Sequence, residues 1–440
     1  MSARPPSPAR VVITGIGLIS PLGNTPAQFA SALAAGESGV RLNEAYAKSD
    51  APLRFAGLAT QFTGAIDDFG QLPKDRKKAI RKGLKVMCRE TQMAVASAQL
   101  ALADAGLHEA SETPERCGVV LGSDYMLTLP EDYLHSVSKC APDGQQFQYE
   151  RWGEEGLGEM QPLWMLKYLP NMPASHIAIY NDFRGPNNSL TMREASGLMA
   201  IGEAMRIVAR GHADQMLAGA TGTRVLPMQA IHATQVEPIA NDGDSPTAAS
   251  RPFDKARTGM VVGEGAGMMI LESLDHAQAR GARIYGELVG FGSSQVCDLD
   301  MRGKNDVALA NAMTAALRDA GQQPSEVGHL NAHGLATPEA DRDEAQAIAA
   351  VFGDTATQPP LVAPKANFGN LGAGSGVVEL AASLLAKESG ALPRVLNYSE
   401  PDPTAPVNAV TGADASPGEV FLSVNTTPQG QAAAVCVQFR

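Results

Sequence analysis

The strongest constraint on the fold is a rhythm of short apolar runs and helical patterns that starts again after about residue 280. Buried runs of this kind, alternating with helices, predict a layered α/β fold. The strand-like runs of the first part are RVVITGIGLIS (10–20), CGVVLGS (117–123), ADQMLAGAT (213–221) and GAGMMILES (265–273). Those of the second part are 282–292, 328–334, 360–366, 419–427 and 432–439.

The expected helices lie between these runs, at 90–106, 196–210, 305–320, 340–352 and 375–388. The repeated rhythm predicts two structurally similar halves, residues 1–275 and 276–440, although their sequences share little. The region from about 124 to 180 is rich in Tyr, Met, Trp and Pro and interrupts the first half. We expect this irregular excursion to line a site or an interface.

Composition excludes several classes of function. The net charge of −12 argues against a nucleic-acid binder, and no run approaches 18 apolar residues, so no membrane span is expected. The start of the chain, MSARPPSPARVVITG, has no apolar run ahead of Arg10 and is interpreted as a short tail rather than a signal peptide. The five cysteines are scattered without zinc-like spacing, which favours unpaired thiols in a reducing cytoplasm and predicts no metal site.

One segment opposes the acidic balance of the chain. Residues 74–85 (KDRKKAIRKGLK) contain a dense group of cations that includes Lys74, Arg76, Lys77 and Lys78. The segment is either a solvated helix face or a docking site for an acidic partner, because like charges so close together repel unless something compensates them.

The stretch TMREASGLMAIGEAM (191–205) predicts a helix with a carboxylate at its tip. Leu198, Ile201 and Met205 follow at three- and four-residue steps, while Glu194 stands at the beginning. The positive end of a helix dipole favours an anion there. The question is whether Glu194 performs chemistry at that tip.

Several motifs together resemble the β-ketoacyl-acyl carrier protein synthases of the thiolase superfamily, and synthase II most of all. The resemblance implies the five-layer αβαβα thiolase fold with two pseudo-symmetric halves, usually in a dimer, and implies no cofactor. The motifs are VVITGIGLISPLGN (11–24), FRGPNNSLTMREASGLMAIGEAMRIV (183–208), RPFDKARTGMVVGEGAGMMILE (251–272), NAHGLATPEADRDEAQAI (331–348) and PKANFGNLGAGSGVVEL (364–380).

The family performs decarboxylative Claisen condensation with a cysteine and two histidines. Position by position, the resemblance places the cysteine on Glu194, the first histidine on His333 and the second on Asn370. The family's lysine and glutamate fall on Lys365 and Glu379. Two members of the catalytic triad have therefore changed.

A further motif departs near the C-terminus. The stretch NTTPQGQAAAV (425–435) keeps Gly430 but has Gln429 about where the family has a phenylalanine gate. Together with Thr337 in the first histidine motif, these residues are expected to line the substrate pocket.

Ordinary condensation is disfavoured because acyl transfer to a carboxylate produces a reactive anhydride. Three alternatives stay open: decarboxylation of malonyl-carrier without condensation, general acid–base chemistry by Glu194 with His333, and a non-catalytic role like that of a chain-length factor. The first needs a side chain that mimics an acylated cysteine, and a His and Asn pair can still polarise a thioester carbonyl.

Plainer interpretations stand beside these. His333 is then a core histidine, Asn370 a helix cap, and Lys365 with Glu379 a buried ion pair. The resemblance also implies partners: an acyl carrier protein, which would dock on residues 74–85, and either an identical subunit or an active ketosynthase.

Overall fold

The computed structural model describes residues 8–46, 51–108, 111, 113–240, 243 and 245–440. Two half-sheets meet edge to edge in one hydrogen-bonded network, in the order β10-β9-β11-β12-β8-β1-β7-β6-β4-β5. The first half-sheet comprises β1 (Val11–Ile19), β4 (Cys117–Ser123), β5 (Asn187–Leu190), β6 (Gln215–Thr223) and β7 (Val262–Ser273). The second comprises β8 (Gly286–Gln295), β9 (His329–Asn331), β10 (Leu361–Val362), β11 (Val420–Thr426) and β12 (Gln431–Gln438). Two short strands, β2 (Val40–Leu42) and β3 (Phe55–Gly57), pair with each other at the side, and β3 also pairs with β7.

The two half-sheets repeat one pattern of strand directions. In the first, β4 is parallel to β5 and β6, and β7 is antiparallel to β6 and β1. In the second, β9 is parallel to β10 and β11, and β12 is antiparallel to β11 and β8. The antiparallel pair β1–β8 joins them, with Val11 opposite Leu288. The placing of the domain boundary at residue 275 stays a prediction.

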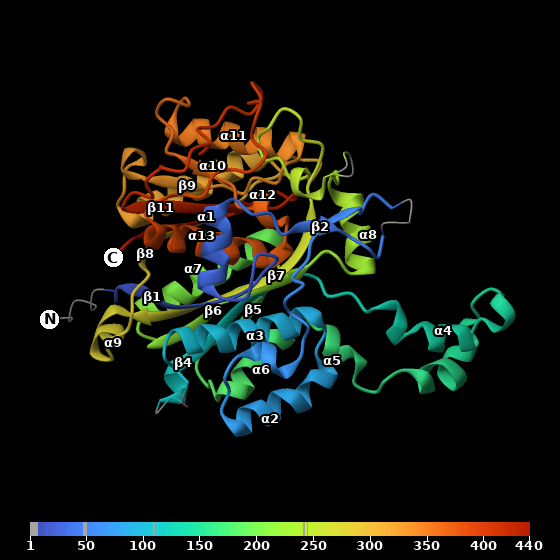
Figure 1. Ribbon diagram of the computed structural model, residues 1–440. Coiled ribbons are helices and arrows are strands. Elements are labelled where there is room, and N and C mark those ends of the chain that lie inside the picture. Colours follow the sequence, from blue (N-terminus) through green and yellow to red (C-terminus); the bar gives the residue numbers. More distant parts are fainter. Residues whose placement is uncertain (1–7, 47–50, 109–110, 112, 241–242, 244) are drawn as a thin grey trace.

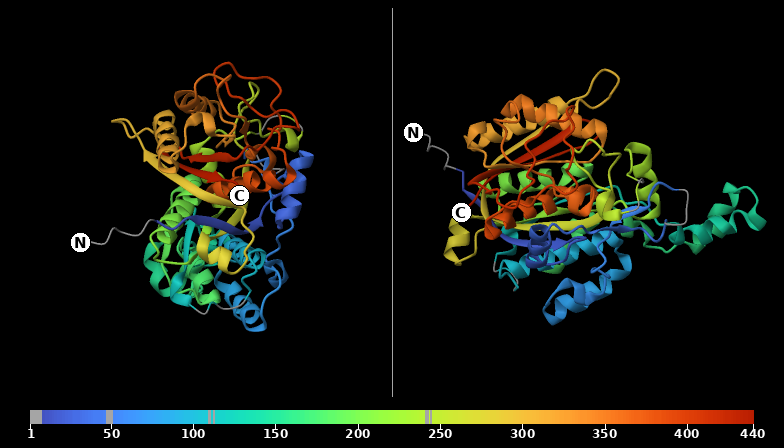
Figure 2. Two further views of the ribbon diagram at one scale, coloured as in Figure 1. Left: turned by 90° about the vertical axis from the view of Figure 1, so that its left-hand side faces the viewer. Right: turned by 45° about the horizontal axis from the view of Figure 1, so that its top comes forward.

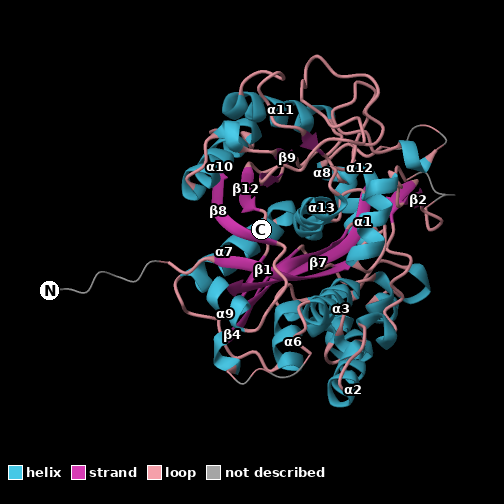
Figure 3. Cartoon of the chain, turned by 60° about the vertical axis from the view of Figure 1, so that its left-hand side comes forward, coloured by secondary structure: helices cyan, strands magenta, loops and turns pink. Residues whose placement is uncertain are grey.

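Helices fill three of the five layers of this fold (Figures 1 and 3). α7 (Ser196–Ala209) and α13 (Ser375–Ser389) lie between the half-sheets, α3 (Arg89–Asp104) covers the outer face of the first, and α10 (Asn305–Ala320) and α11 (Pro338–Phe352) cover the second. The remaining helices are α1 (Pro26–Ala35), α2 (Lys74–Gly83), α4 (Leu134–Lys139), α5 (Trp164–Tyr168), α6 (Met172–Asn181), α8 (Pro227–Val236), α9 (Leu274–Ala279) and α12 (Lys365–Phe368).

The central layer forms because most residues of both helices are small or apolar and are buried. Leu198, Ile201 and Val208 of α7 are fully buried in one cluster with Val377 and Leu380 of α13. A helix that is buried all round must lie inside the protein, and here both half-sheets pack against the pair. The periodicity of residues 196–210 is therefore confirmed.

Three expected strands are shorter than predicted. The run 328–334 forms a strand only over His329–Asn331. The run 360–366 pairs only over Leu361–Val362, since Pro364 has no N–H to give to a ladder and Lys365 already begins α12. The run 282–292 begins pairing at Gly286, opposite Ile13 of β1. In the described part of the chain, the structure contains no helix both long enough and apolar enough to span a bilayer.

The excursion at about 124–180 projects as an arm from the body of the molecule (Figures 1 and 2), except for α6 at its end, which packs against α3. Short α- and 3-10-helical turns build it, and many of its large apolar side chains are exposed. They are Leu134, Phe147, Tyr149, Leu157, Leu163 and Met165. The arm follows directly from β4 and returns through α6 to β5, so its root lies beside the end of the half-sheet where the candidate site is found.

Candidate functional site

The tip of α7 is a buried, strained turn. A 3-10 turn, Arg193–Ala195, precedes the helix, and Arg193 adopts a positive φ of 50°. This conformation is costly for a residue with a side chain and occurs most often at functional sites. The Ser196 hydroxyl accepts a hydrogen bond from the Met192 N–H (2.7 Å) and holds the turn closed. Glu194 is thereby pointed into the interior and is 2% exposed.

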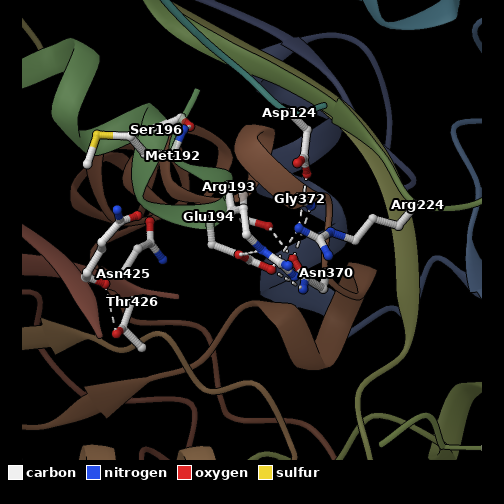
Figure 4. Close-up of polar contacts among 12 residues, drawn as sticks. Asp124, Met192, Arg193, Glu194, Ser196, Arg224, Asn370, Gly372, Asn425 and Thr426 are labelled. Atoms are coloured by element: carbon white, nitrogen blue, oxygen red, sulfur yellow. Dashed lines mark hydrogen bonds and ion pairs between the residues drawn. The ribbon is translucent and has the colours of Figure 1, made fainter. Parts of the chain in front are cut away.

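Glu194 lies among hydrogen-bond donors (Figure 4). Its Oε1 lies 2.9 Å from Nη2 of Arg224 and accepts a hydrogen bond from Nδ2 of Asn370 at 3.0 Å. Its Oε2 lies 3.4 Å from Nε of Arg193. Arg224 Nη2 is also 3.0 Å from Oδ2 of Asp124. Two carboxylates and two guanidinium groups therefore form one buried network.

The network keeps Glu194 ionised. Burial alone raises the pKa of a carboxyl, but the charges of Arg224 and Arg193 and the hydrogen bond from Asn370 outweigh it and hold the pKa of Glu194 well below its usual range. A carboxylate with such a low pKa is a weak base and has no proton to donate near neutral pH.

A second buried network surrounds His333. Lys365 Nζ lies 2.5 Å from Oε1 of Glu379 and donates to the His333 carbonyl at 2.7 Å. Asn425 Nδ2 donates to Oε2 of Glu379 at 2.8 Å. The predicted pairing of Lys365 with Glu379 is thus found, and Asn425 joins them.

The surroundings of the ring fix the hydrogen on His333. Its Nδ1 is 3.3 Å from both Lys365 Nζ and Asn425 Nδ2, which are donors, so Nδ1 accepts and the ring N–H is on Nε2. Burial and then the charge of Lys365 lower the pKa of His333 well below its usual value. Glu344 accepts from the backbone N–H groups of His333 (2.7 Å) and Gly334 (2.8 Å) and holds this loop. His333 is therefore neutral and can donate from Nε2.

The residues expected to line the substrate pocket lie in different environments, some buried and one exposed. Thr337 is buried and caps α11 by accepting from the N–H of Ala340 at 3.3 Å. Gln429 is exposed on the tight turn between β11 and β12, where Gly430 has a φ of 76°. A role for these residues in an acyl pocket stays a prediction.

The basic segment forms α2 on the outer surface. Lys74, Lys78, Arg81 and Lys82 are exposed. Two of the residues singled out from the sequence are engaged locally: Lys77 pairs with Asp67 at 2.7 Å, and Arg76 lies 3.4 Å from the side-chain oxygen of Gln99. Four further positive charges thus face solvent on one helix.

Sequence reasoning missed Arg224 and Asp124. Each directly follows a buried strand, β6 and β4 respectively, and neighbouring parallel strands end at the same edge of the sheet. A lone arginine after an apolar run was the available signal. No group of three His, Cys, Asp or Glu side chains within the described ranges is placed to hold a metal ion.

The chain belongs to the β-ketoacyl synthase family. Residues 9–277 match the family's N-terminal domain and residues 285–399 its C-terminal domain. The chain is 35% identical to the 3-oxoacyl-[acyl-carrier-protein] synthase 2 of Vibrio cholerae over 398 residues, which are 90% of each chain. It is 33% identical to the synthase 2 of Synechocystis over 92% of this chain and 91% of the relative. The predicted kinship with synthase II is confirmed.

Solved structures show the same fold. A β-ketoacyl synthase from Burkholderia phymatum superimposes with a TM-score of 0.83 at 28% identity, covering 98% of this chain and 100% of that one. The ishigamide ketosynthase/chain length factor gives a TM-score of 0.79 at 27% identity, covering 98% and 100%. A type II polyketide ketosynthase in complex with its acyl-carrier protein gives 0.80 at 25% identity, also covering 98% and 100%. The thiolase fold expected from the sequence is confirmed.

Proposed function

We propose that this chain is a ketosynthase-like subunit of fatty-acid or polyketide assembly that does not itself condense acyl groups, and that it pairs with an active ketosynthase. The observation that carries the proposal is the buried contact of the Glu194 carboxylate with Arg224 and Asn370, at the position where the resemblance places the family's nucleophile. Acylation of such a carboxylate would create an anhydride and abolish its ion pair.

The same observation weakens the two catalytic alternatives. General acid–base chemistry needs a pKa near the working pH, and that of Glu194 is held far below it. Decarboxylation of a malonyl group develops negative charge on the thioester oxygen, which an adjacent carboxylate repels. In addition, Asn370 already donates Nδ2 to Glu194.

Decarboxylation remains the second candidate because of one specific feature. His333 is neutral, has its N–H on Nε2, and is held by Lys365, Asn425 and Glu344. A histidine in this state can donate a hydrogen bond to a developing enolate oxygen. The decarboxylase hypothesis therefore rests on His333 rather than on Glu194.

The decisive experiment is mass spectrometry of malonyl-carrier protein incubated with the purified chain, with an active β-ketoacyl synthase as the positive control for the substrate. Glu194→Ala and His333→Ala variants are assayed in parallel. We expect the malonyl-carrier to stay unchanged. Acetyl-carrier formed by the unmodified chain, and lost in His333→Ala, would refute the non-catalytic role and establish a decarboxylase.

The arm supports pairing with another subunit. Its large apolar side chains include several that are mostly exposed, such as Tyr149 (79% exposed) and Leu163 (57% exposed). An exposed apolar surface of this kind is typical of protein–protein interfaces. We assign it to a second thiolase-fold subunit, since one of the similar solved structures is named as a ketosynthase/chain length factor.

The four exposed cations of α2 support docking of an acidic carrier protein, and we place this encounter in the cytoplasm. Each surface pair contributes about 0–1 kcal/mol, so several must act together. We expect Lys78→Glu combined with Lys82→Glu to weaken carrier binding about tenfold at low salt, and the difference to shrink as salt screens the charges. Arg318→Glu, an exposed position on α10 of the other half, is the matched control and should leave binding unchanged.

A further inference from the structure

Arg224 is a buried cation that contacts two carboxylates. Its side chain is fully buried, and its Nη2 lies 3.0 Å from Asp124 and 2.9 Å from Glu194. Its Nε and Nη1 have no hydrogen-bond partner among the residues that the structure describes. The guanidinium group therefore depends on its two carboxylates.

The backbone around the arginine leaves room for this ion pair. Gly372 approaches it from the turn before α13 and has a φ of 60°. A Cβ atom there would lie 2.5 Å from Oδ2 of Asp124 and 3.1 Å from Nε of Arg224. Any other residue would thus collide with the pair, so a glycine at this position is part of what accommodates it.

The charges around position 194 balance when Glu194 is included. Arg193 and Arg224 supply two cations, and Asp124 and Glu194 supply two anions. A neutral group at position 194 leaves one buried guanidinium charge in excess, which is among the most unfavourable changes a protein interior can undergo.

We propose that Arg224 is a positioning residue that demands a permanent anion at position 194, and that it, together with Glu194, prevents this helix tip from carrying an acyl group. The inference rests on the proposed non-catalytic role and explains it. A cysteine alone in place of Glu194 does not restore acyl transfer. Its thiolate forms readily beside Arg224, but acylation removes the anion that the arginine needs.

The chemical step makes the conflict explicit. The thiolate attacks the carbonyl carbon of an acyl thioester, the new C–S bond forms, the donor's C–S bond breaks, and the donor leaves as a thiolate that takes up a proton from water. The charge on the protein sulfur disappears in this step. Arg224 then faces a neutral thioester with only Asp124 left as a counter-ion.

Several charged or titratable groups from different elements influence position 194, and the test must separate them from Arg224. They are Arg193 in the preceding turn, Asp124 and Tyr125 after β4, Glu237 after α8, His333 after β9 and Glu379 in α13. All of these groups are retained when only Arg224 is replaced. A difference between two variants that differ only at position 224 therefore reports the effect of the arginine.

The experiment compares Glu194→Cys with Glu194→Cys combined with Arg224→Met. The pKa of the introduced thiol is measured from its rate of alkylation by iodoacetamide against pH, resolved at the peptide level because the chain has five other cysteines. Acylation by an acyl-N-acetylcysteamine thioester is followed by intact mass.

We expect the thiol pKa to lie about two units lower in the single variant than in the double variant, and acylation to be at least about tenfold faster in the double variant. Glu194→Cys with Arg206→Met, which removes a partly exposed cation paired with Asp319, is the control and should match the single variant. Equal thiol pKa values, or equal acylation, overturn the role of Arg224.

Loss of folding in Glu194→Cys does not leave the proposal without a test. Thermal unfolding of Glu194→Gln, Arg224→Met and the pair of changes together then decides, because coupled residues give a double variant that loses less than the sum of the singles. Additive losses overturn the proposal. Turnover of malonyl-carrier by the unmodified chain would overturn the proposed function rather than the role of Arg224. The measurement of the thiol pKa does not depend on that result.

Discussion

Replacing Lys365 by methionine tests whether the residues around His333 that match the family's catalytic set stabilise the fold. Nζ of Lys365 lies 2.5 Å from Oε1 of Glu379, and the two side chains are 2% and 0% exposed. Removing one partner of a buried ion pair typically costs about 3–5 kcal/mol, because the other charge stays buried without compensation. We expect Lys365→Met to lose this much unfolding free energy at pH 8, measured by urea denaturation.

The loss should depend on pH with a definite sign. Burial already raises the pKa of Glu379 despite Lys365, and removing the lysine raises that pKa further. The folded variant then holds a proton that the unfolded chain, with a glutamate pKa near 4.3, releases. Its stability relative to the unmodified chain therefore rises as pH falls, by about 1.4 kcal/mol per pH unit between the folded pKa of Glu379 in the variant and the lower folded pKa of Glu379 in the unmodified chain.

Two comparisons make the result interpretable. Lys365→Met with Glu379→Gln removes both charges and should cost less than Lys365→Met alone, about 1–3 kcal/mol, because no charge is left uncompensated and only the hydrogen bond from Lys365 to the His333 carbonyl is lost. Lys387→Met is the control: Lys387 pairs with Glu419 at 2.9 Å on the surface, with 37% and 78% exposure, and should cost at most about 1 kcal/mol. A cost below about 1 kcal/mol for Lys365→Met at pH 8, or one that does not change with pH, refutes the reasoning.

Two further perturbations probe buried positions in the first half of the chain and beside Arg224: the buried carboxyl of Glu90, which accepts a hydrogen bond from Gln229, and the glycine that faces the Arg224–Asp124 pair. Burial raises the pKa of Glu90 to about 7. Folding therefore becomes less favourable by about 3 kcal/mol as the pH rises from 4.5 to 7. In Glu90→Gln this part of the pH dependence should vanish from the urea-unfolding profile, and an unchanged profile contradicts the prediction. Gly372→Ala should lower the free energy of unfolding by about 2 kcal/mol or more, because the new Cβ collides with Asp124. Gly321→Ala is the control: Gly321 has a φ of 66° but no atom within 4 Å of the new Cβ, so this variant should lose about 1 kcal/mol from backbone strain alone. Equal losses of the two variants in thermal unfolding would show that the crowding is unimportant.

The sequence carries the information for the framework because that information is local. The apolar steps of Leu198, Ile201 and Met205 identify α7, and helices 305–320 and 340–352 are found within two residues of their predicted limits. The motifs around Glu194 and His333 place both residues at element ends, where the structure has them. The apolar periodicity of a helix and a family motif each lie within one continuous segment of the sequence.

The counter-ion of Glu194 was not predictable in this way. Arg224 is thirty residues away along the chain, and it reaches the tip of α7 only because β6 lies beside β4. That neighbourhood is a long-range property of the sheet, which no periodicity within one strand reports. The protonation state of Glu194 depends on the same arginine and so could not be assigned from residue types alone. The projecting arm likewise gave only a compositional signal.

The chemistry at the tip of α7 explains why a buried ion pair occupies it. Such pairs are seldom more stable than well-packed apolar groups of the same size, so stability alone does not account for Arg224 and Glu194. A nucleophile must change its charge during acyl transfer, whereas these two residues fix each other's charge. The turn keeps its strained geometry, with Arg193 at a φ of 50°, but the group it presents cannot react. The subunit role that we propose, beside an active ketosynthase, would use that geometry without that reactivity.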